Sequence, residues 1–455
     1  MGIETINHII SKSNFKFNYL SNGKVKTKTR EQTLSKLMKF SNEINAKKII
    51  YKSKLIISVL SEINFLEIEF AVFFAQNIHF PINIFKSSSF IKRTILETQP
   101  DLIIVDNYRM YDKIKSFFYH DRIILLDSED VYNKIIQNYF LLSHSDFSTA
   151  VIMSTSGSTG QPKYICHSYK SIFYSASIFS NSDIFKNTNR YLHILSSSFS
   201  GGRKVFYAAI LNNLSISFKS KSKSVIDNIK LFSPDITALT PTILLEIIDY
   251  IKINGNDLSL KKVICGGAFL NKEDIDFLSL NNIKVFNVYG LTETASLVSY
   301  NSEEFFNENS VGKINDEIDF FIDQDNVLHV KGNMIFQGYW RNKSIQQFNN
   351  DYFCTNDICY IDNDGFLYIK GRKDRNVKNN KGEWVNLDIL KNELGKSYNL
   401  NIQLFYTNNK IDLHIYSNEI PEDLNLKSFL EENGLLLNEI KIINKKVRPY
   451  NQIIK

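Results

Sequence analysis

Short apolar runs alternate with amphipathic stretches from about residue 48 onward. Residues 65–77 and 89–99 carry apolar side chains at helical spacing and predict helices. Runs that are apolar throughout predict buried strands, and they occupy residues 47–51, 55–60, 101–106, 122–127 and 150–155. Because strands that alternate with helices usually form parallel sheets covered by helices, this part of the chain predicts an α/β fold.

The later part of the chain continues this alternation and then changes character. Residues 235–251, 261–267 and 283–290 extend the pattern, and Thr240 and Pro241 suit the N-cap and first position of a helix. After about residue 310, short alternating strands surround Asp, Asn and Gly turns, which is typical of antiparallel hairpins. We therefore expect a large domain of mostly parallel sheets covered by helices, with a small antiparallel, barrel-like part.

A domain boundary is expected near Asp374, just after the hairpin region. The stretch beyond it is too short to repeat the first architecture, and it predicts at most two helices and a few strands. The predicted domains are therefore residues 1–373 and a small α+β domain of residues 374–455.

Composition and charge indicate a globular protein without a nucleic-acid surface. The chain has 54 Lys and Arg against 48 Asp and Glu, a net charge of +6 spread over 455 residues. The short Lys/Ser run at 219–224 is therefore better explained as solvated surface than as a nucleic-acid groove. Cys166, Cys265, Cys354 and Cys359 show no paired spacing, which disfavours a zinc site or a disulfide framework.

The most apolar region, residues 55–86, is interrupted by Glu62, Glu67 and Glu69. It cannot supply the roughly 20 uninterrupted apolar residues of a membrane span. The first ten residues lack the basic start and the small-residue cleavage site of a signal peptide. We therefore expect a cytoplasmic protein without a membrane span.

One loop is built from small and hydroxyl side chains that have little to pack: Thr155, Ser156, Gly157, Ser158, Thr159, Gly160, Gln161, Pro162 and Lys163. It follows a predicted strand, and ligands of α/β sheets bind beyond the carboxyl ends of strands. Gly157 and Gly160 allow N–H groups to turn inward, and Lys163 adds a positive charge, which together suit a polyphosphate. Pro162 before the Lys departs from the Walker pattern, and taken alone the loop also fits a Ser-rich surface turn.

Further motifs follow in order along the chain: CGGAFL (265–270), NVYGLTET (287–294), GYW (338–340), YFCTNDICYIDNDGFLYIKGRKDR (352–375) and KGEWVN (381–386). With this ordered set, the chain from about residue 148 to its end resembles the acyl-adenylate-forming (AMP-binding) superfamily. That superfamily includes acyl- and aryl-CoA ligases, adenylation domains of peptide synthetases and luciferases. Taken singly, Tyr289, Asp357, Arg372 and Asp374 also fit core, turn or surface roles, but the ordered set favours function.

The resemblance implies a role for each matching residue of the large domain. The loop from Thr155 to Lys163 would cover the β- and γ-phosphates of ATP, and Tyr289, followed by Gly290, would lie on the adenine. Thr292 would contact the α-phosphate, and Glu293 would hold Mg²⁺, which prefers carboxylate oxygens. The strand end Gly266, Gly267 and Ala268 would border the adenine and acyl pockets.

The resemblance also assigns roles near and beyond the expected boundary. Asp357 would bind the ribose hydroxyls with help from Arg372, and Asp374 would be the hinge of a mobile small domain. The family ends this domain with a catalytic Lys six residues after a Pro, and Lys455 has that spacing from Pro449. The alternative for a final residue is a frayed terminus.

The segment 194–211 matches the acid-binding part of the family. Phe199 is followed by Ser200 instead of the Asp that binds an amino-acid amine, so an α-amino acid is disfavoured. Gly202 keeps the Gly of a His-x-x-Gly pattern whose His is lost. Arg203 or Lys204 would pair with a second carboxylate or a phosphate if it faced the pocket; the alternative is a pair of exposed charges at a helix start. The expected acid-site residues are Phe199, Ser200, Gly202, Lys204 and Gly267.

The resemblance implies ATP-dependent activation of a small-molecule carboxylic acid as acyl-AMP, with release of pyrophosphate, followed by transfer to a thiol. Mg²⁺ and ATP are the implied cofactors, and CoA is the first choice of acceptor. An acyl carrier protein with a phosphopantetheine thiol is the alternative partner. A non-catalytic nucleotide-binding homologue is disfavoured, because Lys163, Thr292, Glu293, Asp357 and Arg372 are all kept. Two departures from the family, Tyr164 and Asn356 where Gly is usual, put the turnover rate in doubt.

Overall fold

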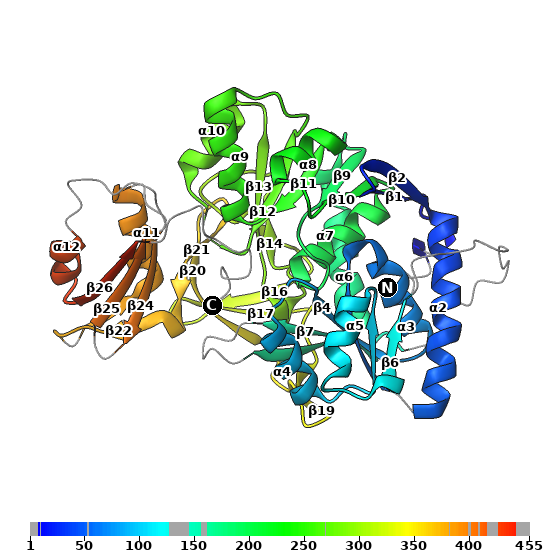
Figure 1. Cartoon of the computed structure of the whole chain (residues 1–455). Helices are drawn as coiled ribbons and strands as arrows, with labels where there is room; N and C mark the ends of the chain where they lie inside the picture. The colour runs from blue at the N-terminus through cyan, green and yellow to red at the C-terminus, as the bar shows by residue number, and fades with distance from the viewer. Residues whose placement is uncertain are drawn as a thin grey trace. The chain divides into compact units, whose positions relative to one another are not determined.

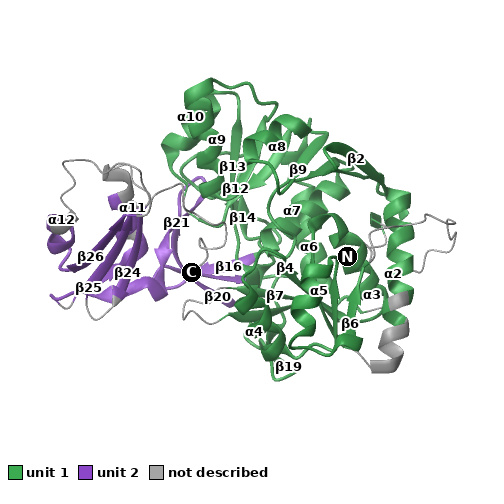
Figure 2. Ribbon diagram, in the orientation of Figure 1, with its two compact units in different colours: residues 1–157, 161–318, 331–351 green, residues 158–160, 319–330, 352–455 purple. Residues whose placement is uncertain are grey.

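The computed structural model describes residues 8–9, 11–51, 54–126, 145–155, 162–268, 270–381, 383–398, 402–407, 410–415 and 426–442 (Figure 1). Its chain forms two compact units (Figure 2). The first comprises residues 1–157, 161–318 and 331–351, and the second comprises residues 158–160, 319–330 and 352–455. The predicted boundary at Asp374 lies inside the second unit, and a division of the chain there stays a prediction.

A nine-stranded sheet forms half of the first unit, in the order β15-β14-β13-β12-β11-β9-β10-β1-β2. Its strands are β1 (Lys16–Ser21), β2 (Lys24–Thr29), β9 (Arg190–His193), β10 (Ser215–Phe218), β11 (Ile236–Leu239), β12 (Lys262–Gly266), β13 (Lys284–Tyr289), β14 (Ser299–Tyr300) and β15 (Lys313–Ile314). The strands from β13 to β1 are parallel to one another, and antiparallel strands close both edges.

An eight-stranded sheet forms the other half, in the order β19-β18-β8-β7-β4-β3-β5-β6. Its strands are β3 (Leu55–Leu60), β4 (Ile78–Asn83), β5 (Leu102–Val105), β6 (Ile123–Leu125), β7 (Thr149–Thr155), β8 (Lys163–Ser168), β18 (Gly338–Arg341) and β19 (Ser344–Gln347). The strands from β7 to β6 are parallel, whereas β8, β18 and β19 add antiparallel ribbons at one edge.

Helices cover these sheets (Figure 1). They are α2 (Arg30–Tyr51), α3 (Phe65–Phe74), α4 (Ser88–Thr98), α5 (Tyr108–Lys115), α6 (Tyr169–Ser180), α7 (Ser200–Leu211), α8 (Val225–Phe232), α9 (Pro241–Asn254) and α10 (Lys272–Leu280). Short 3-10 turns are η1 (Glu62–Asn64), η2 (His120–Arg122), η3 (Asp183–Phe185) and η4 (Thr292–Thr294) in the first unit and η5 (Lys373–Arg375) in the second.

Strand β3 is buried on both of its faces, which explains its unbroken apolar sequence. Leu55, Ile57 and Val59 pack in one cluster with residues of α4 and α5. Ile56 and Leu60, which point to the opposite face, pack with residues of α2 and α3. A third cluster joins α8, α9 and α10 to β11, β12 and β13.

The second unit contains smaller sheets. Its four-stranded sheet, in the order β16-β17-β20-β21, comprises β16 (Asp319–Ile322), β17 (Val327–Lys331), β20 (Phe353–Ile361) and β21 (Leu367–Arg372). The remaining elements are β22 (Asn376–Lys378), β23 (Trp384–Asn386), α11 (Leu387–Tyr398), β24 (Ile402–Thr407), β25 (Lys410–Ile415), α12 (Leu426–Glu432) and β26 (Leu436–Ile442). Leucines of α11 pack with Leu430 of α12 and with β24 and β25 in one apolar core.

The predicted α/β class with mostly parallel sheets is confirmed. Helix α9 begins at Pro241 after Thr240, as expected. One predicted strand is wrong, because residues 47–51 form the end of helix α2. Among the described residues, no helix combines the length and the apolar character that crossing a membrane requires.

The glutamates that interrupt the apolar region each have a buried partner. Glu67 pairs with Lys28 of the β1–β2 hairpin. Glu69 lies 3.1 Å from the Arg203 guanidinium and accepts hydrogen bonds from His79 at 2.7 Å and Tyr207 at 2.6 Å. Burial acts to raise the pKa of Glu69, but Arg203 first and then His79 and Tyr207 outweigh it, and the pKa lies below its ordinary value.

We expect Glu69→Gln to lower the free energy of unfolding by about 3–5 kcal/mol, because Arg203 would stay buried without its counter-charge. Denaturant unfolding of the full chain measures this loss. Asp112→Asn is the matched control, since it breaks the exposed pair with Lys115 and should cost less than about 1 kcal/mol. Equal losses in the two variants would contradict the structural role of Glu69.

Candidate active site

The two arms of the hydroxyl-rich loop are adjacent strands. Thr155 ends β7 and Lys163 begins β8, and the two residues face each other across the antiparallel pair. The loop residues between them that we predicted, Ser156, Gly157, Ser158, Thr159 and Gly160, lie outside the described residues. The loop therefore starts and ends at the carboxyl edge of the parallel strands, where ligands of such sheets bind.

An aromatic ring lies below the ammonium group of Lys163. Tyr339 of β18 has its ring centroid 5.8 Å from Lys163 Nζ, and β18 pairs directly with β8. Burial, followed by the nearby Glu293 carboxylate, raises the pKa of Tyr339 to about 12. Lys163, Tyr339 and Glu293 are thus neighbours, although they are up to 176 residues apart in the chain. The motif GYW contained this tyrosine, but its contact depends on strand pairing that the sequence does not show.

A buried histidine joins β8 to the Thr-Glu motif. His167 Nε2 lies 2.7 Å from the Thr292 carbonyl, and its Nδ1 lies 3.0 Å from Ser171 Oγ. Burial lowers the pKa of His167 to about 4, so the ring is neutral near pH 7. It then donates through Nε2–H to Thr292 and accepts from Ser171. This contact holds the backbone of the predicted phosphate and magnesium residues against β8.

The turn after the Thr-Glu motif is strained and held by polar contacts. Ala295 and Ser296 have φ angles of 46° and 60°. Residues other than Gly rarely adopt this backbone conformation. Ser175 Oγ donates to the Ala295 carbonyl at 2.7 Å, and Lys204 Nζ donates to the Ser296 carbonyl at 2.6 Å. The Ser200 and Ser296 hydroxyls are 2.6 Å apart. The predicted acid-site helix α7 is therefore tied directly to the segment that carries Thr292 and Glu293.

Two glycines of the predicted site allow this close packing. A Cβ atom at Gly290 would lie 2.3 Å from the Ser296 carbonyl carbon, and one at Gly202 would lie 2.3 Å from the Ser196 carbonyl oxygen. These approaches exclude any side chain. Gly266 ends β12 beside β13, which carries Tyr289, and Gly267 and Ala268 follow directly.

A carboxylate from the eight-stranded sheet holds the loop before α7. Glu62 accepts a hydrogen bond from the Ser197 backbone N–H at 3.0 Å and another from the Ser196 hydroxyl, and it lies 3.2 Å from His193 Nε2. Burial acts to raise the pKa of Glu62, but these donors outweigh it, and the pKa lies below its ordinary value. The sequence marked Glu62 only as an interruption of an apolar run, because its partners are more than 130 residues away.

The two cations at the start of α7 are buried. Arg203 and Lys204 are 1% and 3% exposed, so the alternative of exposed surface charges is wrong. Arg203 pairs with Glu69, and Lys204 Nζ lies 4.2 Å from the Phe179 ring centroid besides its bond to Ser296. Burial lowers the pKa of Lys204 to about 7.

A third cation, which the sequence did not single out, lies beside the predicted acid site. The Lys86 ammonium lies 5.3 Å from the Phe199 ring centroid and 4.9 Å from that of Phe90. Lys86 belongs to the turn after β4, where its N–H donates to the Asn83 carbonyl. Burial lowers the pKa of this lysine. No motif contains Lys86, and only the packing against Phe199 reveals it.

The remaining predicted residues are in the second unit and form a set of their own. Asp357 faces Arg372 across the β20–β21 pair, with 3.4 Å between Asp357 Oδ1 and Arg372 Nη1. Arg372 also donates two hydrogen bonds to Asp374, at 3.0 and 3.2 Å. The structure therefore brings these three residues together. Lys455 lies outside the described residues.

Glu293 is the one residue that the sequence predicts to hold Mg²⁺. Within the described part of the chain, no three His, Cys, Asp or Glu side chains cluster as a metal site. A single carboxylate such as that of Glu293 suits Mg²⁺, which is often bound by one or two carboxylates together with substrate phosphates.

The two mixed sheets and this set of residues define a class, the acyl-adenylate-forming α/β proteins. A family model described as "AMP-binding enzyme" matches residues 16–340, and the chain belongs to this family. A 2-succinylbenzoate–CoA ligase of Staphylococcus epidermidis is 28% identical over 237 residues. That alignment covers 50% of each protein, so the chain spans about half the length of this curated relative.

Solved structures share the fold over nearly the whole chain. The o-succinylbenzoate CoA synthetase of Bacillus subtilis with its acyl-adenylate intermediate superposes with a TM-score of 0.78 at 16% identity, covering 100% of this chain and 96% of that one. The same enzyme in complex with ATP and a magnesium ion gives a TM-score of 0.76 at 16% identity, covering 100% and 98%. At 16% identity, this similarity shows that the chain and the synthetase share a fold.

We expect the stability of the protein to depend on pH through Lys204. Its pKa is about 7 in the folded chain and about 10.4 in an unfolded one, so between these values only the unfolded state holds the proton. The free energy of unfolding should then rise with pH by about 1.4 kcal/mol per unit, relative to Lys204→Met.

Denaturant unfolding from pH 6.5 to 9.5 measures this difference. Lys261→Met, which removes an exposed lysine, is the control and should parallel the unsubstituted protein. Parallel curves for Lys204→Met and the unsubstituted protein would contradict the depressed pKa.

Proposed function

We propose that the chain activates a carboxylic acid with ATP, forming acyl-AMP and pyrophosphate, and then transfers the acyl group to a thiol, most directly that of CoA. One observation supports this most strongly. Lys163, Tyr339, Glu293 and the Thr292 backbone form one contiguous group at the strand start where the hydroxyl-rich loop ends. Such a group provides the cation, the carboxylate and the donors that a triphosphate with Mg²⁺ requires.

We assign the nucleotide contacts as the family pattern suggests. The loop from Thr155 to Lys163 would hold the β- and γ-phosphates, Tyr289 and the Gly266–Ala268 strand end would border the adenine, and Thr292 would contact the α-phosphate. Glu293 would hold Mg²⁺, which neutralises charge on the phosphates when bound. In the second unit, Asp357 and Arg372 would bind the ribose. Asp357 and Arg372 lie opposite each other across the β20–β21 pair, so they can act as one group.

In the first step, an oxygen of the substrate carboxylate attacks the α-phosphorus, and the bond to the pyrophosphate oxygen breaks. No proton is transferred, because the carboxylate is already ionised near pH 7. The chain therefore contributes positioning and charge neutralisation. Lys163 would stabilise the leaving pyrophosphate, and Lys455 would reach the carboxylate and the α-phosphate.

In the second step, a thiolate attacks the acyl carbonyl and AMP leaves. We place Asp374 at the hinge that brings the segment from Lys378 to Gly382 to the site. Trp384, which follows this segment and is 68% exposed, would line the path of the pantetheine arm. Its ring lies 5.5 Å from Lys378 Nζ. A carrier-protein phosphopantetheine in place of CoA would use the same path.

We propose further that the acid has a second anionic group and that Lys86 binds it. Phe199, Ser200, Gly202 and Gly267 would border the acid. Arg203 and Lys204 are already bonded inside the unit, so Lys204 would act through Ser296. Among the described residues, the Lys86 ammonium contacts two aromatic rings and pairs with no carboxylate. The curated relative is named for 2-succinylbenzoate, which carries two carboxylates.

Pyrophosphate release, measured over a panel of carboxylic acids with ATP and Mg²⁺, tests the proposed activity. Glu293→Gln should lower the rate at least 100-fold, because Mg²⁺ would lose its protein carboxylate. Lys455→Ala should lower adenylation with little effect on ATP binding. Glu308→Gln, which breaks an outer ion pair with Lys272, is the control. A protein that neither binds nor consumes ATP with any acid would refute the proposal, and parallel assays with CoA and a carrier protein identify the acceptor.

Lys86→Met tests the second anionic group. We expect kcat/KM to fall about tenfold or more for 2-succinylbenzoate, since one charge pair is lost. It should stay unchanged for 4-oxo-4-phenylbutanoate, which has the same skeleton without the ring carboxylate. Lys92→Met is the control, because Lys92 also lies over a ring, that of Phe117 at 5.5 Å. An equal effect on both acids would refute the role of Lys86 while leaving the ligase activity intact.

A further inference from the structure

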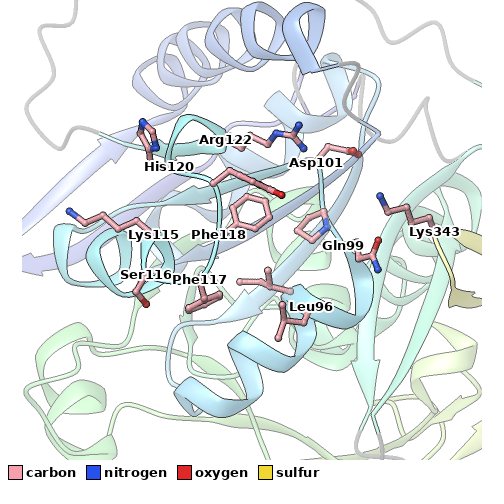
Figure 3. Close-up of a pocket in the computed structure, with 13 residues that line it drawn as sticks. Leu96, Gln99, Asp101, Lys115, Ser116, Phe117, Phe118, His120, Arg122 and Lys343 are labelled. Atoms are coloured by element: carbon pink, nitrogen blue, oxygen red, sulfur yellow. The ribbon is translucent and has the colours of Figure 1, made fainter.

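A cavity of about 820 Å³ opens in the first unit, where α4 and α5 end (Figure 3). Asp101 immediately precedes β5 and η2 immediately precedes β6, so the cavity lies at the amino ends of these parallel strands. Thr155, by contrast, ends β7 at the carboxyl edge of the same sheet. The cavity is therefore distinct from the proposed nucleotide and acid sites. Its volume is in the range of small-molecule sites, roughly 300–1,000 Å³.

The floor of the cavity is aromatic and apolar. Phe117, Phe118 and Tyr119 follow one another along the chain and line the cavity, together with Leu96 of α4 and Pro100 just beyond the end of that helix. Figure 3 shows Phe117, Phe118 and Leu96 among the lining residues. Tyr119 is 68% exposed and Leu96 is 55% exposed. An apolar ligand that covers this exposed surface removes it from water, and this burial favours binding.

The charged groups around this floor are mostly cations. Lys115, Arg122 and Lys343 line the cavity with His120, and Asp101 is the single carboxylate among the lining residues. The Asp101 carboxylate already accepts the backbone N–H groups of Lys54 and Leu55, at 2.8 and 2.9 Å. Lys115 pairs with Asp112 at 2.8 Å, and the Arg122 guanidinium lies 5.2 Å from the Tyr119 ring centroid. The cavity therefore favours an anion.

The backbone conformation of Lys343 independently indicates a function for its side chain. It occupies the two-residue turn between β18 and β19, where Arg341 pairs with Ser344. Asn342 and Lys343 have φ angles of 49° and 59°, the geometry of a type I′ turn, whose second position is normally Gly. A lysine there is strained. Strain that a glycine would relieve is often retained for a function of the side chain, and this side chain lines the cavity.

We propose that this cavity binds an aromatic organic anion, whose rings lie on Phe117, Phe118 and Tyr119 and whose carboxylate, sulfonate or phosphate group is bound by Lys343 and Arg122. The ligand class follows from the combination of aromatic lining and cationic rim: the Phe118 and Tyr119 rings, inclined by 63° to each other, present both a face and an edge to an aromatic ligand. Lys343 comes from a segment more than 200 residues away from the rest of the cavity, so only the folded chain forms the site.

Fluorescence titration of the full chain with 8-anilinonaphthalene-1-sulfonate tests the proposal. We expect one saturable site that saturating ATP does not displace. Lys343→Gly should raise the Kd about tenfold, the effect of losing one charged contact, without lowering the denaturation midpoint, because Gly relieves the turn. N-phenyl-1-naphthylamine, which has the same rings without the sulfonate, should bind equally to both proteins.

Two further variants locate the probe. Asn342→Gly changes the same turn but keeps Lys343, so its Kd should equal that of the unsubstituted protein. Leu96→Glu places a negative charge on the exposed wall of the cavity and should weaken binding of both probes. The proposal is overturned if no saturable binding occurs, if ATP displaces the sulfonate probe, or if Lys343→Gly and Leu96→Glu leave its Kd unchanged.

Discussion

The two large sheets are joined by two carboxylates of one short segment, of which Glu69 is buried and Glu62 is partly exposed. Glu62 and Glu69 follow β3 of the eight-stranded sheet, but their partners, Ser197 and Arg203, follow β9 of the nine-stranded sheet. A buried charge is tolerated only when its partner stays within a few ångströms. These two contacts therefore fix the start of α7 relative to β3. Glu67 of the same segment pairs with Lys28, which lies in the edge strand β2 of the nine-stranded sheet.

This constraint continues into the candidate site. The start of α7 carries Ser200 and Lys204, which bind the side chain and the carbonyl of Ser296. Ser296 closes the strained turn that follows Thr292 and Glu293, and His167 of β8 donates to the Thr292 carbonyl. The Thr-Glu motif is thus supported by both sheets at once. Such support from packed, hydrogen-bonded neighbours is what a site needs to hold phosphates in fixed geometry.

Local patterns predicted much of this fold, and non-local contacts account for the errors. The runs at 55–60, 101–106 and 150–155 are strands because both faces are buried. The run at 47–51 has the same local appearance, but it continues a helix that starts at Arg30, and a short apolar run cannot distinguish the two cases. The hairpin β1–β2 went unpredicted because its second strand, KVKTKT, is almost entirely polar and exposed.

In the candidate site, too, local motifs were predictable from the sequence and non-local contacts were not. The residues proposed to bind the nucleotide occur in short motifs, so sequence alone indicated Lys163, Thr292, Glu293, Asp357 and Arg372. Two further residues, Glu62, which holds the loop before α7, and Tyr339, which lies against Lys163, are recognisable only from partners more than 100 residues away. Arg203 and Lys204 had the charge of surface residues and proved buried, because their partners Glu69 and Ser296 come from other elements.

Two departures from the family pattern have structural explanations that preserve the site. Asn356 replaces a Gly before Asp357 and has a φ angle of 60°, and Asn is one of the few residues that tolerate this conformation. Tyr164 replaces a Gly after Lys163, but its ring is buried and its hydroxyl donates to Glu97 of α4, on the helix-covered face of the sheet. Since adjacent residues of a strand point to opposite faces, Tyr164 directs its bulk away from the side on which Lys163 lies. Both substitutions therefore keep the backbone course that Lys163 and Asp357 require.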